Sequence, residues 1–570
     1  MTVTAPFAPH HHSVGRKKKT NIRRSCMALR RTTVEELATK AARTVGARLA
    51  EHVARTPDKV LLSMPGVEYT YASFHAETNR MARGFQRLGV KKGDTVCQML
   101  PNCPAFLLNW IALAKFGAIE VGVNTEFSGD ALVRLLNVSE ARILVLDAQF
   151  DAAIAKVAAE LVHLEHIIIQ GPSEYRAHEG LSHFTISRLE DLPDASAEDV
   201  AADVSRIDTL MLVFTSGTTG VSKAVEISHS YALHFAAEMI DNWGLGEDDV
   251  LYSPYPLFHT EASVLTFLTA LHCGARAAIA PKFSASRFWD EIRHYGVTFT
   301  TFMGAVTTIL YKRPPEPNDA DNPLRLVSSC PTPPFWREFE KRFNLKIVET
   351  YGATECCQPS WDPLDVPHRD GACGKITDRY EVRIADDFDE AVPTGTIGEI
   401  LIRPKEPYTM MTRYFRNPEA TAEVFKNLWY HTGDLGHRDG DGYLYFIGRK
   451  KDSIRRRGKN ISAFEVEEIL NKHPAILESA VIGVPSEFTE DEVKAVIVLR
   501  PDRSADPVEI IAWAMDNMPK YYVPRYVEIT VELPKSSTGK VQKVELRERW
   551  RNASTFDGEA GTIINNVEAR

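Results

Sequence analysis

The sequence contains few of the features that mark disulfide-rich or zinc-binding proteins. Cysteine is scarce, with eight among 570 residues, and no two cysteines have the CxxC spacing typical of a zinc site. Without paired spacings or a dense framework, a disulfide scaffold is not indicated either. The pattern fits a reducing compartment, so we expect a cytoplasmic protein. The cysteines are Cys26, Cys97, Cys103, Cys273, Cys330, Cys356, Cys357 and Cys373.

Long apolar runs and strong net charge are also missing. The most apolar stretch, AFLLNWIALAKFGAIEVGV from Ala105, is interrupted by Asn109, Lys115 and Glu120. Burying these groups in lipid would be costly, so the stretch predicts a core helix that runs into a strand. The formal net charge of -9 is modest for this length and favours neither nucleic acid nor an anionic membrane as the main partner. Small molecules are the expected partners.

Length and periodicity predict an α/β protein with at least two domains. A chain of 570 residues exceeds the roughly 250–300 residues at which a single core stops growing. From Val34 onward, apolar residues at helical spacing alternate with strand-like runs such as KVLLSM and DTVCQML, which predicts sheets covered by helices. The runs GEILIR and YLYFIG indicate a β-rich subdomain, and the last hundred residues have strands and helices of their own.

The expected organisation is a large N-terminal domain of α/β sheets with a small β-rich subdomain, followed by a small α+β C-terminal domain. We place the large domain at residues 34–448, the small one at 449–550, and a disordered tail at 551–570. The polar stretch 172–203 lacks periodicity and predicts a long loop.

Residues 1–33 form a basic extension that we expect to be disordered, because they carry many Lys and Arg residues and no acid. A transit peptide would have this composition, and so would residues upstream of a true start at Met27. We favour the second interpretation.

A loop rich in glycine and hydroxyl residues follows the apolar strand TLMLVF. Such a loop can wrap a phosphate, because glycines let the backbone approach a polyanion and hydroxyls and N–H groups donate to it. A P-loop is the obvious alternative, but Ser222 stands where its second glycine belongs and Ala224 where its metal-binding hydroxyl belongs. A simple Gly/Ser-rich turn is the remaining alternative. The predicted phosphate-binding residues are Thr215, Ser216, Gly217, Thr218, Thr219, Gly220 and Lys223.

Six further motifs follow in order: FHT at Phe258, YGATE at Tyr351, GEILIR at Gly398, YHTGD at Tyr430, GRKKD at Gly448 and PKSSTGK at Pro534. Together with the loop TSGTTGVSK at Thr215 to Lys223, these motifs resemble those of the AMP-forming adenylating enzymes. This family includes acyl-CoA synthetases, firefly luciferase and the adenylation domains of peptide synthetases, and the resemblance covers the chain from about Val34 to Trp550. Within that family, the segments AFLLNWIALAKFGAIEVGVNT and MPKYYVPRYVEI resemble crotonobetaine/carnitine CoA ligases most.

The resemblance implies a two-step ligase that uses ATP, Mg²⁺ and CoA. An acid and ATP give an acyl-adenylate and diphosphate, after which a mobile C-terminal domain turns about Lys451 and the CoA thiol displaces AMP. The first step joins two anions, so it requires cations and donors aimed at the α-phosphate and the metal. Lys540 can bridge the carboxylate and the α-phosphate, and Asp434 has two acceptor oxygens for the paired ribose hydroxyls.

The implied roles cover several groups of residues. The catalytic residues are Lys540, Thr354, Glu355 and His259. The loop residues above bind ATP or AMP together with Tyr351, Gly352, Thr354, Asp434, Arg449 and Lys540. The metal ligands are Thr215 and Glu355, and the CoA-binding residues are Gly458, Lys459 and Arg457.

Two segments depart from the family pattern. Cys330-Pro331-Thr332-Pro333 replaces the usual small residues beside adenine, which puts the shape of that pocket in doubt. Arg457-Gly458-Lys459-Asn460 reverses the charge of the usual Gly-Gly-Glu-Asn. The basic residues 455–459 either meet the phosphates of CoA or form a solvated face, and both interpretations stay open.

The sequence leaves the acid and the acceptor undecided. Adenylation domains for α-amino acids typically carry an Asp where this chain has His259, so the resemblance argues against an α-amino acid and implies a carnitine-like or medium-size acyl group. Glu261 could pair with a quaternary ammonium, or it could be solvated. A ligase that loads a separate carrier protein and a nucleotide-binding pseudoenzyme are the alternatives, and a homodimer is an open option.

Overall fold

The computed structural model describes residues 44–200, 202–215, 223–303, 306–333, 335–456, 459–486, 491–535 and 541–564. Several predictions fall outside these residues: the extension 1–33, the loop residues Ser216 to Gly220, and Arg457, Gly458 and Lys540. For Lys451 and Lys459 only the backbone is described. Among the described residues, no helix is long and apolar enough to cross a membrane.

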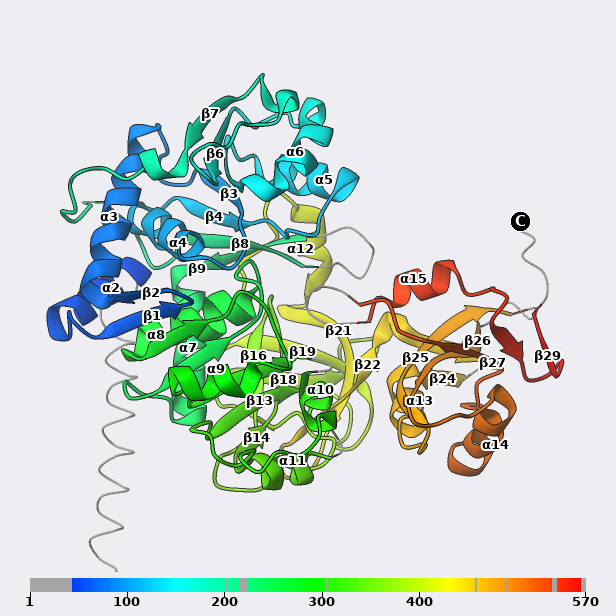
Figure 1. Cartoon of the computed structure of the whole chain (residues 1–570). Helices are drawn as coiled ribbons and strands as arrows, with labels where there is room; N and C mark the ends of the chain where they lie inside the picture. The colour runs from blue at the N-terminus through cyan, green and yellow to red at the C-terminus, as the bar shows by residue number, and fades with distance from the viewer. Residues whose placement is uncertain are drawn as a thin grey trace, which may run out of the picture. The chain divides into compact units, whose positions relative to one another are not determined.

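The first α/β sheet has the strand order β7-β6-β5-β3-β4-β8-β9 (Figure 1). All neighbours run parallel except β9, which is antiparallel to β8. The strands are β3 (Thr95–Met99), β4 (Ile119–Gly122), β5 (Ile143–Asp147), β6 (His166–Gln170), β7 (Thr185–Arg188), β8 (Thr209–Thr215) and β9 (Lys223–Ser228).

Helices cover both faces of this sheet. Alternate residues of β5 enter two separate cores: Val145 packs with α3 (Tyr71–Arg87) and α4 (Pro104–Phe116), and Leu144 packs with α5 (Gly129–Ser139) and α6 (Asp151–Val157). Because the sheet is buried on both sides, strands such as β5 and β8 are almost continuously apolar. The predicted α/β alternation is confirmed here.

The apolar stretch from Ala105 forms the core helix and strand that we predicted. Helix α4 has proline at its first position and ends at Gly117, whose φ of 78° is the left-handed conformation that glycine adopts without strain. Strand β4 follows at once. Asn109 and Glu120 are buried, and each bonds to Gln98.

The second α/β sheet has the order β14-β13-β12-β10-β11-β1-β2, with only β2 antiparallel. Its strands are β1 (Val60–Met64), β2 (Val67–Thr70), β10 (Val250–Ser253), β11 (Arg276–Ile279), β12 (Phe299–Met303), β13 (Leu326–Cys330) and β14 (Lys346–Val348). The helices are α2 (Val45–Arg55), α7 (His229–Trp243), the π-helix η5 (Glu261–Leu268), α8 (Thr269–Cys273), α9 (Phe288–Tyr295), α10 (Val306–Lys312) and α11 (Trp336–Phe343).

Antiparallel strands follow the two α/β sheets. A small sheet consists of β15 (Thr350–Ala353), β16 (Cys357–Trp361) and β17 (Lys375–Ile376). The β-rich subdomain has the order β18-β19-β21-β20, with β22 paired to β21. Its elements are β18 (Tyr380–Ala385), β19 (Gly398–Pro404), α12 (Pro418–Val424), β20 (Phe425–Lys426), β21 (Trp429–Arg438) and β22 (Leu444–Arg449), which include both predicted strand-like runs.

The C-terminal part has its own sheet, ordered β25-β26-β27-β28-β29, and a hairpin of β23 and β24. The elements are η6 (Lys450–Asp452), β23 (Ser453–Arg456), β24 (Lys459–Ser462), α13 (Ala463–Leu470), β25 (Ile476–Pro485), β26 (Asp491–Leu499), α14 (Pro507–Asn517), β27 (Tyr526–Thr530), α15 (Lys543–Glu548), β28 (Thr555–Asp557) and β29 (Thr562–Ile563). A separate apolar core supports this smaller unit.

The structure corrects two predictions. The tail is not disordered over residues 551–564, because β28 and β29 extend the C-terminal sheet and the buried Lys494 donates to Thr555 at 2.9 Å. The stretch 172–203 is not purely a loop, because β7 pairs with β6. Strands β7, β28 and β29 have only four, three and two residues, so periodicity could not reveal them.

Candidate active site

The predicted phosphate loop connects two antiparallel strands. Thr215 ends β8, Lys223 begins β9, and these two residues are Cα partners. A P-loop requires a strand followed by a helix, so the strand at Lys223 excludes that alternative. The Lys223 ammonium lies 5.0 Å from the centre of the Tyr414 ring, which keeps it beside the end of the loop.

Glu355 lies on the connection between β15 and β16 and meets the end of β8. Its Oε1 atom accepts from the Tyr414 hydroxyl at 3.1 Å and from the Thr215 hydroxyl at 3.5 Å. Its backbone carbonyl accepts from the Met411 N–H at 3.0 Å. The structure thus brings together the two predicted metal ligands, which are 140 residues apart in the chain.

Residues Thr215 and Glu355 fit the coordination habits of Mg²⁺. This ion usually takes one or two carboxylates and completes its shell with substrate phosphates and water. Among the described residues, no group of three or more His, Cys, Asp or Glu side chains could hold a metal by itself. A carboxylate beside a hydroxyl therefore suits an ion that arrives with ATP.

Gly352 is required by the shape of the β15–β16 hairpin. A Cβ atom at this position would lie 2.2 Å from the Cys357 carbonyl oxygen, which no side chain can tolerate. The glycine therefore lets the strands approach closely beside Thr354 and Glu355.

Asp434 and Arg449 form the predicted ribose pair on adjacent strands β21 and β22, where they are Cα partners. The Arg449 Nε atom lies 2.7 Å from Asp434 Oδ1, and the Tyr351 hydroxyl donates to Asp434 Oδ2 at 2.6 Å. Burial lowers the pKa of Arg449, but neighbouring acidic groups led by Asp434 raise that pKa more, so it lies above its ordinary value. Three predicted nucleotide residues thus converge, bonded to one another.

Tyr351 also has an aromatic neighbour. Its ring lies nearly parallel to that of Phe446, with 6.1 Å between the centres. Burial, followed by the nearby Asp434 carboxylate, raises the pKa of Tyr351 well above its ordinary value, so its hydroxyl stays protonated as a donor.

His259 lies half-buried just before the π-helix η5. The Ser263 N–H and hydroxyl both donate to its carbonyl oxygen, at 3.2 and 2.9 Å. A Cβ atom added to Gly122 would lie 2.8 Å from Phe258 Cβ, so strand β4 packs tightly against the FHT motif. π-helical turns occur frequently at functional sites.

Glu261 is buried, so the solvated interpretation is wrong. Its carboxyl accepts from Ser253 at 2.6 Å and from Thr266 at 3.4 Å. Burial raises the pKa of Glu261 to about 8. The residue therefore ties the start of the π-helix to the end of β10, and its carboxyl is largely neutral at pH 7.

Glu349 and Thr350 form hydrogen bonds with the unusual segment 330–333. The Thr332 N–H donates to Glu349 Oε2 at 3.0 Å, and the Cys330 thiol donates to the Thr350 carbonyl at 3.5 Å. Burial raises the pKa of Glu349 to about 7. Glu349 and Tyr414 had no motif of their own that could have identified them from the sequence.

The basic segment 455–459 is not a uniform charged face. Arg456 is buried, pairs with Glu492 at 2.6 Å and donates to the Val523 carbonyl at 2.9 Å. The expectation that Arg456 meets CoA or solvent is therefore wrong, because its charge is satisfied inside the C-terminal core. Arg455 is exposed and Lys459 lies on β24, while Lys451 lies in the short helix η6.

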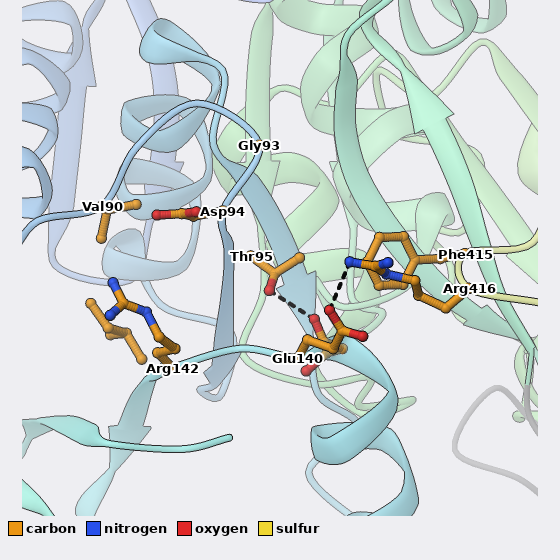
Figure 2. A pocket seen from close by; sticks show the side chains of 10 residues that line it. Val90, Gly93, Asp94, Thr95, Glu140, Arg142, Phe415 and Arg416 are labelled. Carbon is orange, nitrogen blue, oxygen red and sulfur yellow. Dashed lines mark hydrogen bonds and ion pairs between the residues drawn. The ribbon is translucent and has the colours of Figure 1, made fainter. Parts of the chain in front are cut away.

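A pocket of about 230 Å³ lies elsewhere, between the beginnings of β3 and β5 (Figure 2). In it, Arg416 donates to Glu140 at 2.8 Å and Thr95 donates to the Ser139 carbonyl at 2.7 Å. None of its lining residues belongs to the predicted nucleotide or acyl site. They are Val90, Gly93, Asp94, Thr95, Ser139, Glu140, Arg142, Ile143, Phe415 and Arg416.

Comparisons with known proteins identify the family of the chain. The AMP-binding enzyme family matches residues 49–415, and the AMP-binding enzyme C-terminal domain matches residues 465–540. The chain is 34% identical over 493 residues to a crotonobetaine/carnitine–CoA ligase of Salmonella typhimurium, covering 84% of this chain and 93% of that protein.

Solved structures give the same result. An anthranilate CoA ligase in complex with anthranoyl-AMP has a TM-score of 0.80 at 27% identity, covering 90% of this chain and 98% of that one. ATP-bound MatB from Rhodopseudomonas palustris has a TM-score of 0.80 at 26% identity, with 90% and 99% covered. The chain therefore belongs to the AMP-binding enzyme family, within which it is an AMP-forming acyl-CoA ligase that uses ATP, Mg²⁺ and CoA.

Proposed function

We propose that this ligase activates a small carboxylic acid of the carnitine or crotonobetaine kind and transfers its acyl group to CoA. The contacts of Glu355 with Thr215 and Tyr414 at the end of β8 are the observation that supports the ATP and metal site of this proposal. The kind of acid is suggested by the relatives that are 34% identical over most of the chain.

In the proposed first step, Thr354 bonds the α-phosphate and Glu355 and Thr215 hold the metal beside the loop 215–220. Bound Mg²⁺ supplies neutralisation of the phosphate charge. Lys540 bridges the acid carboxylate and the α-phosphate while the carboxylate oxygen attacks phosphorus and diphosphate leaves. Gly352 keeps the hairpin close enough for these contacts.

The nucleotide is proposed to rest against Tyr351, with its ribose hydroxyls on Asp434 and Arg449. Lys223, whose ammonium lies over the Tyr414 ring, is proposed to contact the phosphates. His259, at the head of the π-helix, is proposed to control entry to the acyl site. In the second step Arg457, Gly458 and Lys459 line the approach of CoA, whose thiol displaces AMP.

A screen of diphosphate release over a panel of carboxylic acids, with and without CoA, tests the proposal. Carnitine and crotonobetaine should release diphosphate faster than medium-chain, aromatic or amino acids, and CoA should yield the thioester. Diphosphate release without any CoA thioester would favour a carrier protein as acceptor. Absence of release with every acid would favour a pseudoenzyme.

The proposal includes a C-terminal domain, residues 449–550, that turns about Lys451. Lys540 and the segment near Gly458 belong to the same domain and serve different half-reactions, so a rotation must exchange them. Proline fixes φ near −65°. The Lys451→Pro variant should therefore keep adenylate formation and lose thioester formation, and an unaltered thioesterification rate in the folded variant would refute the rotation.

The proposed location is the cytoplasm, supported by the described cysteines, which are all thiols. Fractionation of the source cells tests it. Light scattering decides between a monomer of 63.8 kDa and the homodimer that the sequence leaves open.

A further inference from the structure

A tyrosine on α7 bonds both ends of the turn that carries Thr354 and Glu355. The Tyr231 hydroxyl donates to the Thr354 carbonyl oxygen at 2.8 Å and accepts from the Cys357 N–H at 2.6 Å. The side chain is 1% exposed, so water does not compete for these bonds. The Tyr231 hydroxyl oxygen thus connects the first and last residues of the 354–357 turn.

The turn ends at a non-glycine residue in the left-handed conformation, which is unfavourable without further contacts. The Cys356 N–H donates to the Ala353 carbonyl at 3.1 Å, and Cys357 follows with a φ of 61°. Three-residue hairpin connections commonly combine a type I turn with a residue in this left-handed region. Glycine adopts it freely, whereas cysteine meets steric resistance from its Cβ atom. Contacts from outside the hairpin must therefore hold the turn.

Helix α7 fixes the place of the supporting hydroxyl. Ser228 caps the helix by accepting from the Tyr231 N–H at 3.1 Å. One turn further along, the Phe235 ring lies parallel to that of Tyr231, with 6.3 Å between the centres. The hydroxyl therefore takes its position from a buried helix and not from a loop.

We propose that Tyr231 is a positioning residue for acyl-adenylate formation, because it holds the 354–357 turn so that Thr354 faces the α-phosphate and Glu355 faces the metal. This inference rests on the proposed roles of Thr354 and Glu355. Glu355 has further contacts to Tyr414, Thr215 and Met411, so loss of the Tyr231 hydroxyl loosens the turn without releasing it.

The test compares Tyr231→Phe with Tyr71→Phe. Tyr71 is an equally buried tyrosine whose hydroxyl donates to a backbone carbonyl, that of Ala275, at 2.8 Å. Both variants lose one buried phenol oxygen, but only the first loses it at the turn. Thermal melts report whether each variant folds, and hydrogen exchange of the apo protein follows the amide of Cys357.

In Tyr231→Phe, the Cys357 amide should exchange about tenfold faster, because its acceptor is gone. The kcat of acyl-AMP formation should fall by about 10- to 100-fold, with the KM for ATP nearly unchanged, because the turn sets reacting geometry. Tyr71→Phe should change neither the Cys357 exchange nor kcat.

Unchanged Cys357 exchange in Tyr231→Phe would overturn the proposal, and so would equal losses of kcat in the two variants. The exchange measurement requires no substrate. If the wild-type protein formed no acyl-AMP with any acid, the proposed function would fail, while faster exchange in Tyr231→Phe would still establish that the tyrosine holds the turn.

Discussion

Asp434 and Glu355 are both predicted to meet the nucleotide complex, yet the protein holds the two acids differently. Asp434 is 3% exposed, and its two oxygens have partners at 2.6 and 2.7 Å. Glu355 is partly exposed, with contacts at 3.1 and 3.5 Å. An acid with short buried bonds must exchange partners when a ligand arrives, whereas one with long contacts can accept a cation directly. The metal position is thus open to its ligand, and the ribose position is closed by the protein's own side chains.

Replacing Lys540 should cause the largest loss of acyl-AMP formation, against which the effects at Glu355 and Asp434 can be compared. The Lys540→Ala variant should lose acyl-AMP formation by about 10³-fold or more, because no other group replaces its charge between two anions. It should still convert synthetic acyl-AMP and CoA to the thioester. Rapid-quench assays of each half-reaction measure this, and equal loss in both would contradict the role.

Replacing Glu355 tests whether this residue binds the metal. Glu355→Gln keeps the shape and removes the charge, so acyl-AMP formation should fall by about 10²-fold, and more Mg²⁺ should be needed for half-maximal rate. Asp434→Asn is the matched control, because it should leave the Mg²⁺ requirement unchanged. The comparison breaks down if both variants shift that requirement equally.

The closed ribose position predicts a smaller effect on binding. Asp434→Asn should raise the KM for ATP by about tenfold. The amide keeps only one acceptor oxygen for the ribose hydroxyls and has no charge to pair with Arg449. Tyr351→Phe sharpens the test, since it removes only the bond that competes with the ribose. Its KM for ATP should stay the same or fall, and a rise as large as that of Asp434→Asn would show that the tyrosine bond assists binding.

A third acid, Glu261, is buried and predicts an effect on stability alone. Burial raises the pKa of Glu261 from its ordinary 4.5 to about 8. Stability linked to the neutral acid is complete below about pH 4.5 and is lost as the pH rises toward 8, at up to about 1.4 kcal/mol per pH unit.

The Glu261→Gln variant should therefore have a flatter dependence of unfolding free energy on pH between 5 and 8. Urea denaturation at several pH values measures this. The preference among cationic, neutral and aromatic acids should not change, because the carboxyl bonds to Ser253 and Thr266 in the core. A changed preference would restore Glu261 as a substrate contact.

The sequence predicted the fold well where periodicity was strong. The stretch from Ala105 became α4 and β4, and the runs GEILIR and YLYFIG became strands of the subdomain. Short strands, such as β7 with four residues and β28 with three, lacked a period long enough to identify them. Their pairing depends on partners brought near by the rest of the fold, which no local pattern encodes.

The sequence predicted site residues that lie in motifs, such as Glu355 and Asp434. It could not predict residues whose role depends on a long-range contact. Tyr414 reaches Glu355 across 59 positions, and Tyr231 reaches the same turn from a helix more than 120 residues earlier. Arg456 showed the reverse error, because a run of charges suggested exposure where one arginine turns inward to Glu492.

The strands after Trp550 also bear on how the protein can be engineered. Lys494 lies fully buried and donates to Glu528, to the Trp550 carbonyl and to Thr555 at 2.5, 2.6 and 2.9 Å. Cutting the chain after Trp550 would remove the Thr555 hydroxyl from this ammonium and strip β28 from β27. The uncovered strand would expose a row of unpaired N–H and C=O groups, which are templates for pairing with another chain. Purification tags and fusion partners therefore belong beyond Ile564, since trimming the tail would replace the two-residue edge strand β29 with the longer edge of β27 as a site for aggregation.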